Sequence, residues 1–290
     1  MKILITGGNG QVGMCLRKIF NNSKHQTFFY SRNELDITNM NEIDFYINKC
    51  KPDVIINAAA YTNVDKAESD SINSEKINSF GPKNLAQKSF DKDILLIHIS
   101  TDYVFDGSKN TPYHEDDGTN PQTAYGIHKL LGENNIIKSN CRYIILRTSW
   151  VYSEFGSNFL KTMIELGKKT NTIKIINDQF GNPTSAHNIA RLIAQLIDSL
   201  PNKSITNEIF HYCGEKEMTW YGFAKSIFRN LELNNLPYPR KIISIQSSDY
   251  PTPAKRPKNS RMSSDKINNI IDIKGTYFEK DIDTVIKNIF

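Results

Sequence analysis

A short apolar segment at residues 2–6 runs directly into a glycine-rich turn, TGGNGQVG, at residues 6–13. A nearly continuous apolar run of this length is typical of a strand buried on both faces of a sheet. Gly7 permits the tight turn, Gly10 lets backbone amides approach a pyrophosphate, and Gly13 lets the following helix lie close to the sheet. Because a strand precedes the turn and a helix follows it, the segment predicts a dinucleotide site, with the helix N-terminus facing the phosphates.

Strand-like and helix-like segments alternate through the first 150 residues. Apolar residues recur at helical spacing directly after the turn, at Val12, Cys15, Leu16, Ile19 and Phe20. Thr38 is the expected N-cap of a second helix, whose apolar face consists of Ile43, Tyr46, Ile47 and Cys50. Further strands are expected at residues 27–30, 53–57, 94–99 and 144–146. This alternation predicts an α/β fold, a doubly wound parallel Rossmann sheet with right-handed crossovers.

The second half of the chain has a weaker pattern. Helices are expected at residues 158–168, 186–200 and 220–231, and residues 237–257 hold five prolines that predict irregular chain. We therefore expect residues 1–150 to form the dinucleotide-binding domain, with a return near 184–212. Residues 151–290 would form mainly a smaller C-terminal substrate lobe.

Composition excludes several classes of protein. The 290 residues are 39% hydrophobic and 23% charged, which suits a chain with a core. No apolar run approaches the roughly 18 residues that a membrane span needs, and the N-terminal run is too short for a secretory signal. The net charge of +5 is spread out, without the basic cluster of a nucleic-acid binder. We expect a cytoplasmic protein that binds neither membrane nor nucleic acid.

The residues after the second strand determine whether such a site prefers NAD or NADP. A carboxylate there would bind the ribose 2′-hydroxyl of NAD, whereas a basic residue would accept the 2′-phosphate of NADP. Arg32 stands at this place, and the first carboxylate is Glu34. We therefore expect NADPH, with NADH as the alternative; the competing interpretation of Arg32 is a solvated loop residue. Asp36 and Ile37 are placed to border the adenine ring.

A tyrosine and a lysine four residues apart on a helix share one face, one turn apart. The ammonium can then lower the pKa of the phenol, which can give a proton to an oxygen becoming an alkoxide. Three such pairs occur: Tyr125/Lys129, Tyr212/Lys216 and Tyr221/Lys225. Only the first follows a strand that ends in a hydroxyl, at Thr101. Ligands of an open parallel sheet bind beyond the carboxyl ends of its strands, so Thr101, Tyr125 and Lys129 are the predicted catalytic set.

With these motifs the chain resembles the extended short-chain dehydrogenase/reductases, and among them the dTDP-4-dehydrorhamnose reductase family. The closer resemblance rests on five blocks spread over the chain: residues 57–68 (NAAAYTNVDKAE), 100–107 (STDYVFDG), 147–152 (RTSWVY), 177–184 (NDQFGNPT) and 250–257 (YPTPAKRP). The resemblance implies reduction of the 4-keto group of dTDP-4-dehydro-L-rhamnose to dTDP-L-rhamnose, the last step in making this sugar donor for cell-surface polysaccharide.

The resemblance also implies roles for individual residues. Gly10, Gln11 and Val12 would lie along the cofactor pyrophosphate, and Ala60, Tyr61 and Thr62 would border the cofactor. Thr101 and Asp102 would contact the sugar, and Trp150 would pack against it. Tyr125 would be the proton donor, and Lys129 would bind the nicotinamide ribose while tuning Tyr125. Asn78 matches an asparagine that supports active-site water in related reductases; an exposed helix asparagine is the competing interpretation.

Metal and anion sites are less well indicated. Some members of the family hold a divalent metal between subunits through glutamates, but the first such position is Cys15 here, which argues against that metal and its dimer. His187 and the other histidines are expected to form no ligand cluster, and all four cysteines to pack in the core. We therefore expect no metal, and either a monomer or a homodimer. Lys255, Arg256 and Arg261 would meet the substrate diphosphate or form a solvated basic loop.

Two other functions compete with the reductase. A nucleotide-sugar dehydratase or epimerase would keep the fold, but such dehydratases have an acid where this chain has Tyr103, and both retain NAD. A non-catalytic regulatory subunit of the methionine adenosyltransferase type also resembles this family. The presence of Thr101, Tyr125 and Lys129 together argues against a purely regulatory role.

Overall fold

A six-stranded sheet, with every pair of neighbours parallel, forms the centre of the computed structural model, which describes residues 1–202, 205–271 and 277–290. Its strand order is β10-β5-β4-β3-β1-β2. The strands are β1 (Lys2–Thr6), β2 (Gln26–Tyr30), β3 (Val54–Asn57), β4 (Leu95–Thr101), β5 (Tyr143–Thr148) and β10 (Glu208–His211). The order reverses between the neighbouring strands β1 and β3, because β2 is added on one side of β1 and β3 on the other. The predicted doubly wound parallel fold is confirmed.

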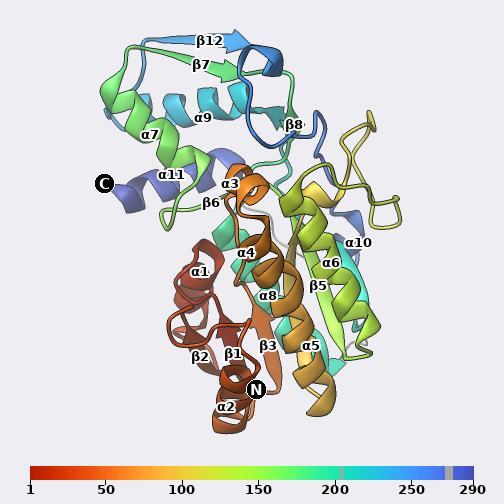
Figure 1. Ribbon diagram of the computed structural model, residues 1–290. Helices are drawn as coiled ribbons and strands as arrows, with labels where there is room; N and C mark the ends of the chain where they lie inside the picture. Colours follow the sequence, from red (N-terminus) through yellow and green to blue (C-terminus); the bar gives the residue numbers. More distant parts are fainter. Residues whose placement is uncertain (203–204, 272–276) are drawn as a thin grey trace.

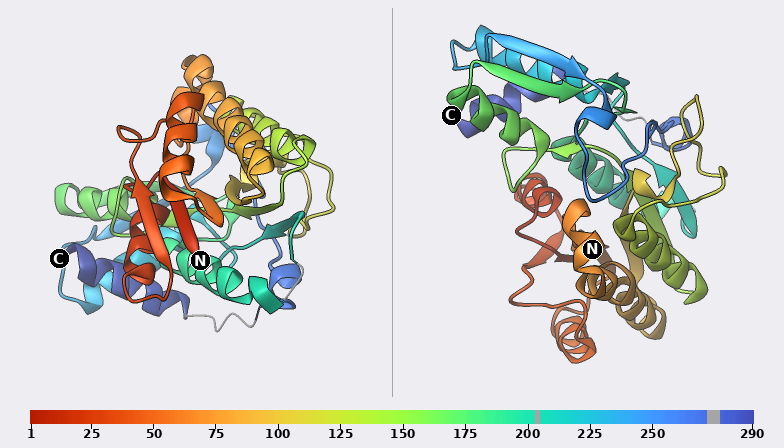
Figure 2. Two further views of the ribbon diagram at one scale, coloured as in Figure 1. Left: turned by 90° about the horizontal axis from the view of Figure 1, so that it is seen from below. Right: turned by 45° about the horizontal axis from the view of Figure 1, so that its top comes forward.

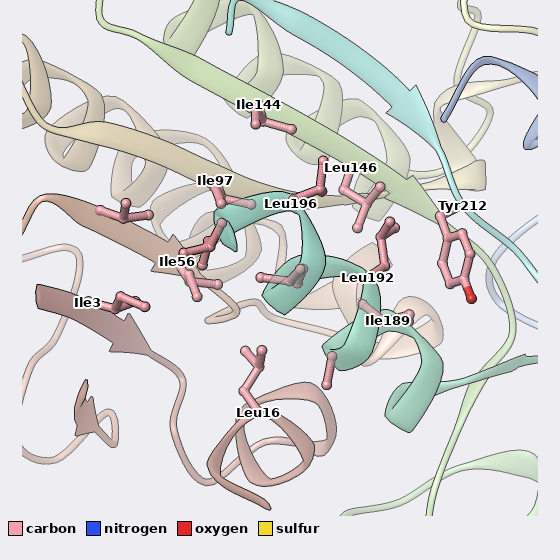
Figure 3. Packing of buried hydrophobic residues seen from close by; sticks show 14 of the residues in the cluster. Ile3, Leu16, Ile56, Ile97, Ile144, Leu146, Ile189, Leu192, Leu196 and Tyr212 are labelled. Atoms are coloured by element: carbon pink, nitrogen blue, oxygen red, sulfur yellow. The ribbon is translucent and has the colours of Figure 1, made fainter. Parts of the chain in front are cut away.

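Helices cover both faces of this sheet, because successive strand residues point to opposite sides. On one face Ile3, Ile56 and Ile97 pack with the apolar sides of α1 (Gln11–Phe20) and α8 (Ala186–Ser199). Figure 3 shows Leu16 of α1 and Ile189, Leu192 and Leu196 of α8 directed toward these strand residues. Full burial of each such side chain contributes about 1.5–3 kcal/mol, so this layer accounts for much of the stability of the domain.

The opposite face carries α2 (Met40–Cys50), α5 (Gly81–Asp91) and α6 (Ala124–Lys138). Leu4, Ile55, Leu96 and Ile145, each one residue out of step with the strand residues of the first face, are buried there with apolar residues of these three helices. The N-cap of α2 differs from the prediction. Asn39 rather than Thr38 caps the helix, because its Oδ1 accepts the backbone N–H groups of Asn41 (3.1 Å) and Glu42 (3.4 Å).

A helical segment follows β3; no bounds were predicted for it, although Asn78 was expected to lie on a helix. It comprises α3 (Val64–Ser69), α4 (Ser71–Glu75) and a single π-helical turn (Lys76–Phe80) that leads into α5. Its inward side buries Ser74, Asn78 and Ser79. An apolar stripe with so many polar members lacks the periodicity by which a helix is recognised.

The C-terminal lobe has a core of its own. α7 (Phe159–Lys169), α9 (Trp220–Leu233) and α11 (Phe278–Ile289) pack together with β7 (Thr172–Ile176), which pairs in parallel with β12 (Lys241–Ile245). In Figure 1 and in the right view of Figure 2 this lobe lies beyond one end of the six-stranded sheet. The two parts of the chain interleave. Lobe elements come before and after residues 184–212, but α8 packs on the six-stranded sheet and β10 is one of its strands.

Short elements join the lobe to the sheet. β6 (Val151–Tyr152) pairs with β9 (Thr184–Ser185), and β8 (Phe180–Gly181) pairs with β11 (Met218–Thr219). α10 (Asp265–Asn268) and three single turns of 3-10 helix (Asp102–Val104, Leu200–Asn202 and Ser247–Asp249) complete the described elements. Within the described ranges no helix combines the length and the apolar character that a bilayer crossing requires.

Candidate active site

The glycine turn between β1 and α1 has the close contacts expected of a phosphate loop. Gly7 adopts φ +68°, and a Cβ there would lie 2.6 Å from the backbone of Ala58. At Gly13 a Cβ would lie 2.3 Å from the carbonyl oxygen of Gly7. Both positions therefore require glycine, one for its conformation and both for space. Gly10 is the N-cap of α1 and has no side chain that could cap the helix. The first backbone amides of α1 are therefore left for a ligand.

A cavity of about 380 Å³ opens beside this turn. Eight of the predicted cofactor residues line it: Gly7, Gly10, Arg32, Asp36, Ile37, Ala60, Tyr61 and Thr62. The side chains of Gln11 and Val12 point away from the cavity: that of Gln11 binds Ser153 (3.0 Å) and Asn158 (2.8 Å), and that of Val12 packs on the core under the sheet. Their backbone amides are the first two of α1. The cavity wall thus comes from the ends of β1, β2 and β3, where a dinucleotide would lie across the strand order reversal.

Arg32 is free to reach a ligand at the rim of this cavity. Its side chain is 71% exposed, and its Nε lies 3.9 Å from the Asp36 carboxylate. The nearby Glu34 is turned away from such a role, because its carboxylate accepts both the backbone N–H (2.8 Å) and the hydroxyl (2.7 Å) of Ser31. These hydrogen bonds lower the pKa of Glu34. An exposed cation at the rim suits a 2′-phosphate better than a ribose hydroxyl.

Asn78 holds the part of the wall that follows β3. Its side-chain oxygen accepts the backbone N–H of Tyr61, and its amide donates to the Tyr61 carbonyl, both at 2.9 Å. The side chain is 1% exposed, so the interpretation of Asn78 as an exposed helix residue is wrong. The residue secures the loop that carries Ala60, Tyr61 and Thr62.

Thr101 stands at the carboxyl end of β4, next to the strand that ends at this wall. Its hydroxyl donates to the carboxylate of Asp102 (2.9 Å) and accepts the backbone N–H of Tyr103 (3.2 Å). Burial raises the pKa of Asp102 to about 6, although the hydrogen bonds that it accepts oppose the rise. Thr101 and Asp102 are therefore two buried polar groups joined by a hydrogen bond.

Tyr125 lies in the first turn of α6, which the Thr123 hydroxyl caps by accepting the N–H of Gly126 at 3.0 Å. Its ring meets that of Tyr103 edge to face, with the centroids 5.6 Å apart. Burial raises the pKa of Tyr125 to about 12, and a hydrogen bond with Thr101 opposes the rise without cancelling it. The direction is opposite to the expected lowering by Lys129, because burial is the largest influence on the phenol. A tyrosine with this pKa stays protonated at neutral pH, as a proton donor must.

Lys129 is 2% exposed and lies one helical turn after Tyr125. Its ammonium nitrogen donates to the Ile99 carbonyl (2.6 Å) and lies 3.2 Å from Nε2 of His98. Burial lowers the pKa of Lys129 to about 8, and the charge of Glu133 opposes this. The structure thus places Thr101, Tyr125 and Lys129 around the end of β4, on two elements that pack together.

A buried ion pair next to these residues was not anticipated. Arg147 of β5 binds the Glu133 carboxylate through Nε (3.0 Å) and through its terminal nitrogen (2.7 Å), and Ser100 donates to the same carboxylate. Both charged side chains are under 5% exposed. The pair ties α6 to β4 and β5 one turn beyond Lys129. No local spacing indicated the pair, because one partner lies on a helix and the other on a neighbouring strand.

Trp150 follows β5 with φ +47°, a conformation that a bulky residue adopts only when its surroundings enforce it. Its ring stacks on Trp220 and covers Gly181, where a Cβ would lie 2.4 Å from the indole. Of the three basic residues predicted to meet the substrate diphosphate, Arg256 binds Asp65 (2.7 Å), Arg261 binds Glu217 (2.9 Å) and Lys255 is exposed.

The expectation that His187 joins no ligand cluster is wrong. Ligand atoms of Cys15, Glu154 and His187 lie within 4.8 Å of one another. The sequence did not show this, because the three residues come from α1, the chain after β6, and α8. Glu154 already accepts Lys18 (2.7 Å) and His187 (2.8 Å). Burial raises the pKa of the Cys15 thiol to about 12, so the cluster is charge-balanced by Lys18 without a thiolate. All four cysteines are buried and free, as predicted.

Comparisons with known proteins agree over almost the whole chain. The family model described as RmlD substrate binding domain matches residues 1–290. A dTDP-4-dehydrorhamnose reductase of Aggregatibacter actinomycetemcomitans is 37% identical over 99% of this chain and 98% of its own. The solved structure of such a reductase from Clostridium acetobutylicum is 38% identical, with a TM-score of 0.92 over 100% of this chain and 99% of that one. Another, from Bacillus anthracis in complex with NADP, is 30% identical, with a TM-score of 0.90 over 99% of each chain.

Proposed function

The chain belongs to the dTDP-4-dehydrorhamnose reductase family, and we propose that it uses NADPH to reduce the 4-keto group of dTDP-4-dehydro-L-rhamnose, forming dTDP-L-rhamnose. The observation that carries the proposal is the position of Thr101, Tyr125 and Lys129 at the end of β4, beside the strand whose end borders the cavity next to the glycine turn. A hydride donor in that cavity and a proton donor at the next strand end are the two requirements of ketone reduction.

The binding of the cofactor is assigned to the cavity wall. Gly7, Gly10 and the first amides of α1 would hold the pyrophosphate, because the turn presents backbone N–H groups and leaves no room for side chains. Arg32 would pair with the 2′-phosphate, and Asp36 and Ile37 would border the adenine. The relative from Bacillus anthracis that was solved with NADP supports this choice of dinucleotide.

The chemical step assigns one role to each residue of the catalytic set. Bound NADPH supplies the hydride that adds to C4 of the sugar. Tyr125 gives its phenolic proton to the carbonyl oxygen, which becomes the hydroxyl of the product. Thr101 holds that oxygen through its own hydroxyl, and Lys129 binds the nicotinamide ribose while its charge sets how readily Tyr125 gives up its proton. Because its pKa is high, Tyr125 is protonated at the start of each turnover.

The substrate would lie between the sheet and the lobe. Asp102, next to Thr101, would accept a sugar hydroxyl, and Trp150 would offer the face of its indole. Trp150 is only partly buried, so part of its indole remains accessible beside Trp220 and Gly181.

The direct test is the absorbance of NADPH and NADH during incubation with enzymatically made dTDP-4-dehydro-L-rhamnose, followed by identification of the sugar formed. We expect one NADPH consumed for each dTDP-L-rhamnose. A dehydratase or an epimerase would show conversion without net oxidation, and a regulatory subunit would show no consumption but would co-purify with a synthetase. Either result would contradict the proposed function.

A further inference from the structure

One ion pair joins the proline-rich segment near the end of the chain to the helix that follows the cofactor cavity wall. Nη2 of Arg256 lies 2.7 Å from Oδ2 of Asp65, and the backbone N–H of Ala254 donates to Oδ1 of the same carboxylate at 3.3 Å. The two charged residues are 191 positions apart in the sequence. Neither has a part in the chemistry assigned above, so the pair needs an explanation of its own.

The helix that carries Asp65, α3, is attached to two other parts of the site. Asn63 is its N-cap and also lines the cofactor cavity. Near the other end of the helix, the carboxylate of Glu68 accepts the backbone N–H of Ala124 at 3.0 Å. Ala124 is the first residue of α6, and its N–H has no acceptor within that helix. Helix α3 is therefore held both to the cavity wall and to the helix that carries Tyr125.

The segment held by Asp65 leads to the residues assigned to the sugar. We call residues 254–260 the strap. Within it, Pro257 packs on Gly107, where a Cβ would lie 2.5 Å from that of Pro257. At its end, Ser260 forms a hydrogen bond with Asp102, which opposes the rise that burial causes in the pKa of Asp102. The strap thus reaches from α3, beside the cofactor cavity, to a residue of the sugar site.

We propose that Asp65 and Arg256 couple the cofactor site to the sugar site. A dinucleotide bound against residues 60–63 restrains the chain that enters α3, and the ion pair passes this restraint to the strap. The dTDP-sugar then meets a strap that is already ordered, so it binds more tightly to the cofactor-bound protein. Asp65 and Arg256 are positioning residues, because they act through the strap and not on the reacting atoms.

The coupling is reciprocal, because two ligands that affect each other's binding do so by the same factor. Bound sugar therefore raises the affinity for NADPH as much as NADPH raises the affinity for the sugar. The sugar half of this inference rests on the proposed function. The restraint of the strap by the cofactor does not, because it needs only NADPH.

The first test is hydrogen exchange of the full-length protein, with and without saturating NADPH. We expect NADPH to slow exchange in wild-type peptides that cover the strap. Asp65→Asn keeps an oxygen for the N–H of Ala254 but has no charge for Arg256, so it should lose this slowing and keep the slowing in peptides of the glycine turn. A wild-type strap that does not respond, while the glycine turn does, would overturn the proposal.

The second test is calorimetric binding of dTDP-L-rhamnose with and without NADPH, a mixture in which both ligands are reduced and no turnover occurs. We expect about tenfold tighter binding to the NADPH-bound wild type. Asp65→Asn and Arg256→Gln should each bring this ratio close to one, and the double variant should lose no more than either single variant. A ratio of one in the wild type, or an unchanged ratio in both variants, would refute the coupling.

The same experiment separates the two proposals. A wild type that does not bind dTDP-L-rhamnose at all contradicts the proposed function, and the exchange of the strap then decides the coupling by itself. If Asp65→Asn does not fold, Arg256→Gln breaks the same ion pair from the strap side and is measured in both tests. Circular dichroism checks the fold of each variant.

Glu217→Gln is the matched control. It breaks the ion pair with Arg261 (2.9 Å), whose side chains are partly exposed like those of Asp65 and Arg256. Glu217 lies next to β11 of the lobe and not beside the cofactor cavity, so this variant should leave both the strap response and the binding ratio unchanged. A loss as large as in Asp65→Asn would contradict a specific role of the Asp65–Arg256 pair.

Discussion

The indole rings of Trp150 and Trp220 stack face to face, with centroids 3.4 Å apart and an angle of 5° between their planes. They are the two tryptophans of the chain. One follows β5 of the sheet and the other begins α9 of the lobe, so the stack fastens the substrate lobe to the dinucleotide-binding part at the place assigned to the sugar.

Gly181→Ala should disturb this stack. The added Cβ would lie 2.4 Å from the indole of Trp150, so the ring must move. We expect a higher KM for the keto-sugar with an unchanged KM for NADPH, and a changed near-UV circular dichroism spectrum, which reports on these two tryptophans. Gly118→Ala is the matched control, because a Cβ there meets nothing within 4 Å. An unchanged keto-sugar KM in Gly181→Ala, despite a changed spectrum, would remove Trp150 from the substrate site.

Tyr125→Phe should lose most of the turnover and keep the fold. Removal of a positioned acid typically costs about 10²–10⁴-fold in rate, and the phenylalanine ring can keep the edge-to-face contact with Tyr103. NADPH oxidation measures the loss, and circular dichroism checks the fold. Tyr221→Phe deletes the same hydroxyl from another Tyr-x-x-x-Lys pair, on α9, and should retain activity. Full activity in Tyr125→Phe would reject the assignment of the proton donor.

Arg32→Ala should weaken NADPH selectively. A hydrogen bond to a charged group contributes about 1.5–3 kcal/mol, so the KM for NADPH should rise about 10–100-fold, while the KM for NADH, which lacks the 2′-phosphate, should hardly change. Initial rates with each cofactor measure the ratio. Arg240→Ala removes an exposed arginine of the lobe and serves as the control. Equal effects of Arg32→Ala on both cofactors would show that Arg32 is a solvated loop residue.

Glu133→Gln should destabilise the protein by about 3–5 kcal/mol, because it leaves the buried guanidinium of Arg147 without a counter-charge. Urea unfolding measures the change. Asp93→Asn makes the same carboxylate-to-amide change in an exposed ion pair: the side chain of Asp93 is 86% exposed and that of its partner Arg142 is 48% exposed. This variant should cost at most about 1 kcal/mol. Similar costs at the two positions would mean that burial of the Glu133–Arg147 pair has little energetic effect.

His211 should make the protein less stable in acid. It is fully buried in β10, and burial, helped by the charge of Arg147, lowers its pKa to about 3. At pH values between about 6.5, the pKa of histidine in the unfolded chain, and about 3, the unfolded chain binds a proton that the folded protein does not. The contribution of His211 to stability is therefore fully present above about pH 6.5 and falls as the pH decreases. The slope from this group approaches about 1.4 kcal/mol per pH unit.

His211→Gln should remove that slope, whatever its constant cost in stability. Urea unfolding at several pH values gives the difference in free energy between wild type and variant, which should shrink as the pH falls. The exposed His114 provides the control, His114→Gln. A difference that stays constant from about pH 7 to 5 would contradict the assignment to His211.

Local sequence patterns were sufficient for the framework. The alternation of apolar segments, the glycines of residues 6–13 and the four-residue spacing of Tyr125 and Lys129 express requirements within single elements: a strand buried on both faces, a turn without room for side chains, a shared helix face. Such requirements are written in consecutive residues. The strand alternation and the doubly wound sheet could therefore be predicted, and the structure confirms the fold.

Packing between distant elements decided the remainder. Glu133 meets Arg147, Lys129 meets His98 and Cys15 meets Glu154 and His187 only after helices and strands are placed against one another. Burial then reverses expectations based on charge alone: the pKa of Tyr125 rises although a lysine lies one turn away, since water is removed from the phenol. Burial and contacts between distant residues arise only when the helices and strands pack together. A pattern in consecutive residues therefore could not predict them.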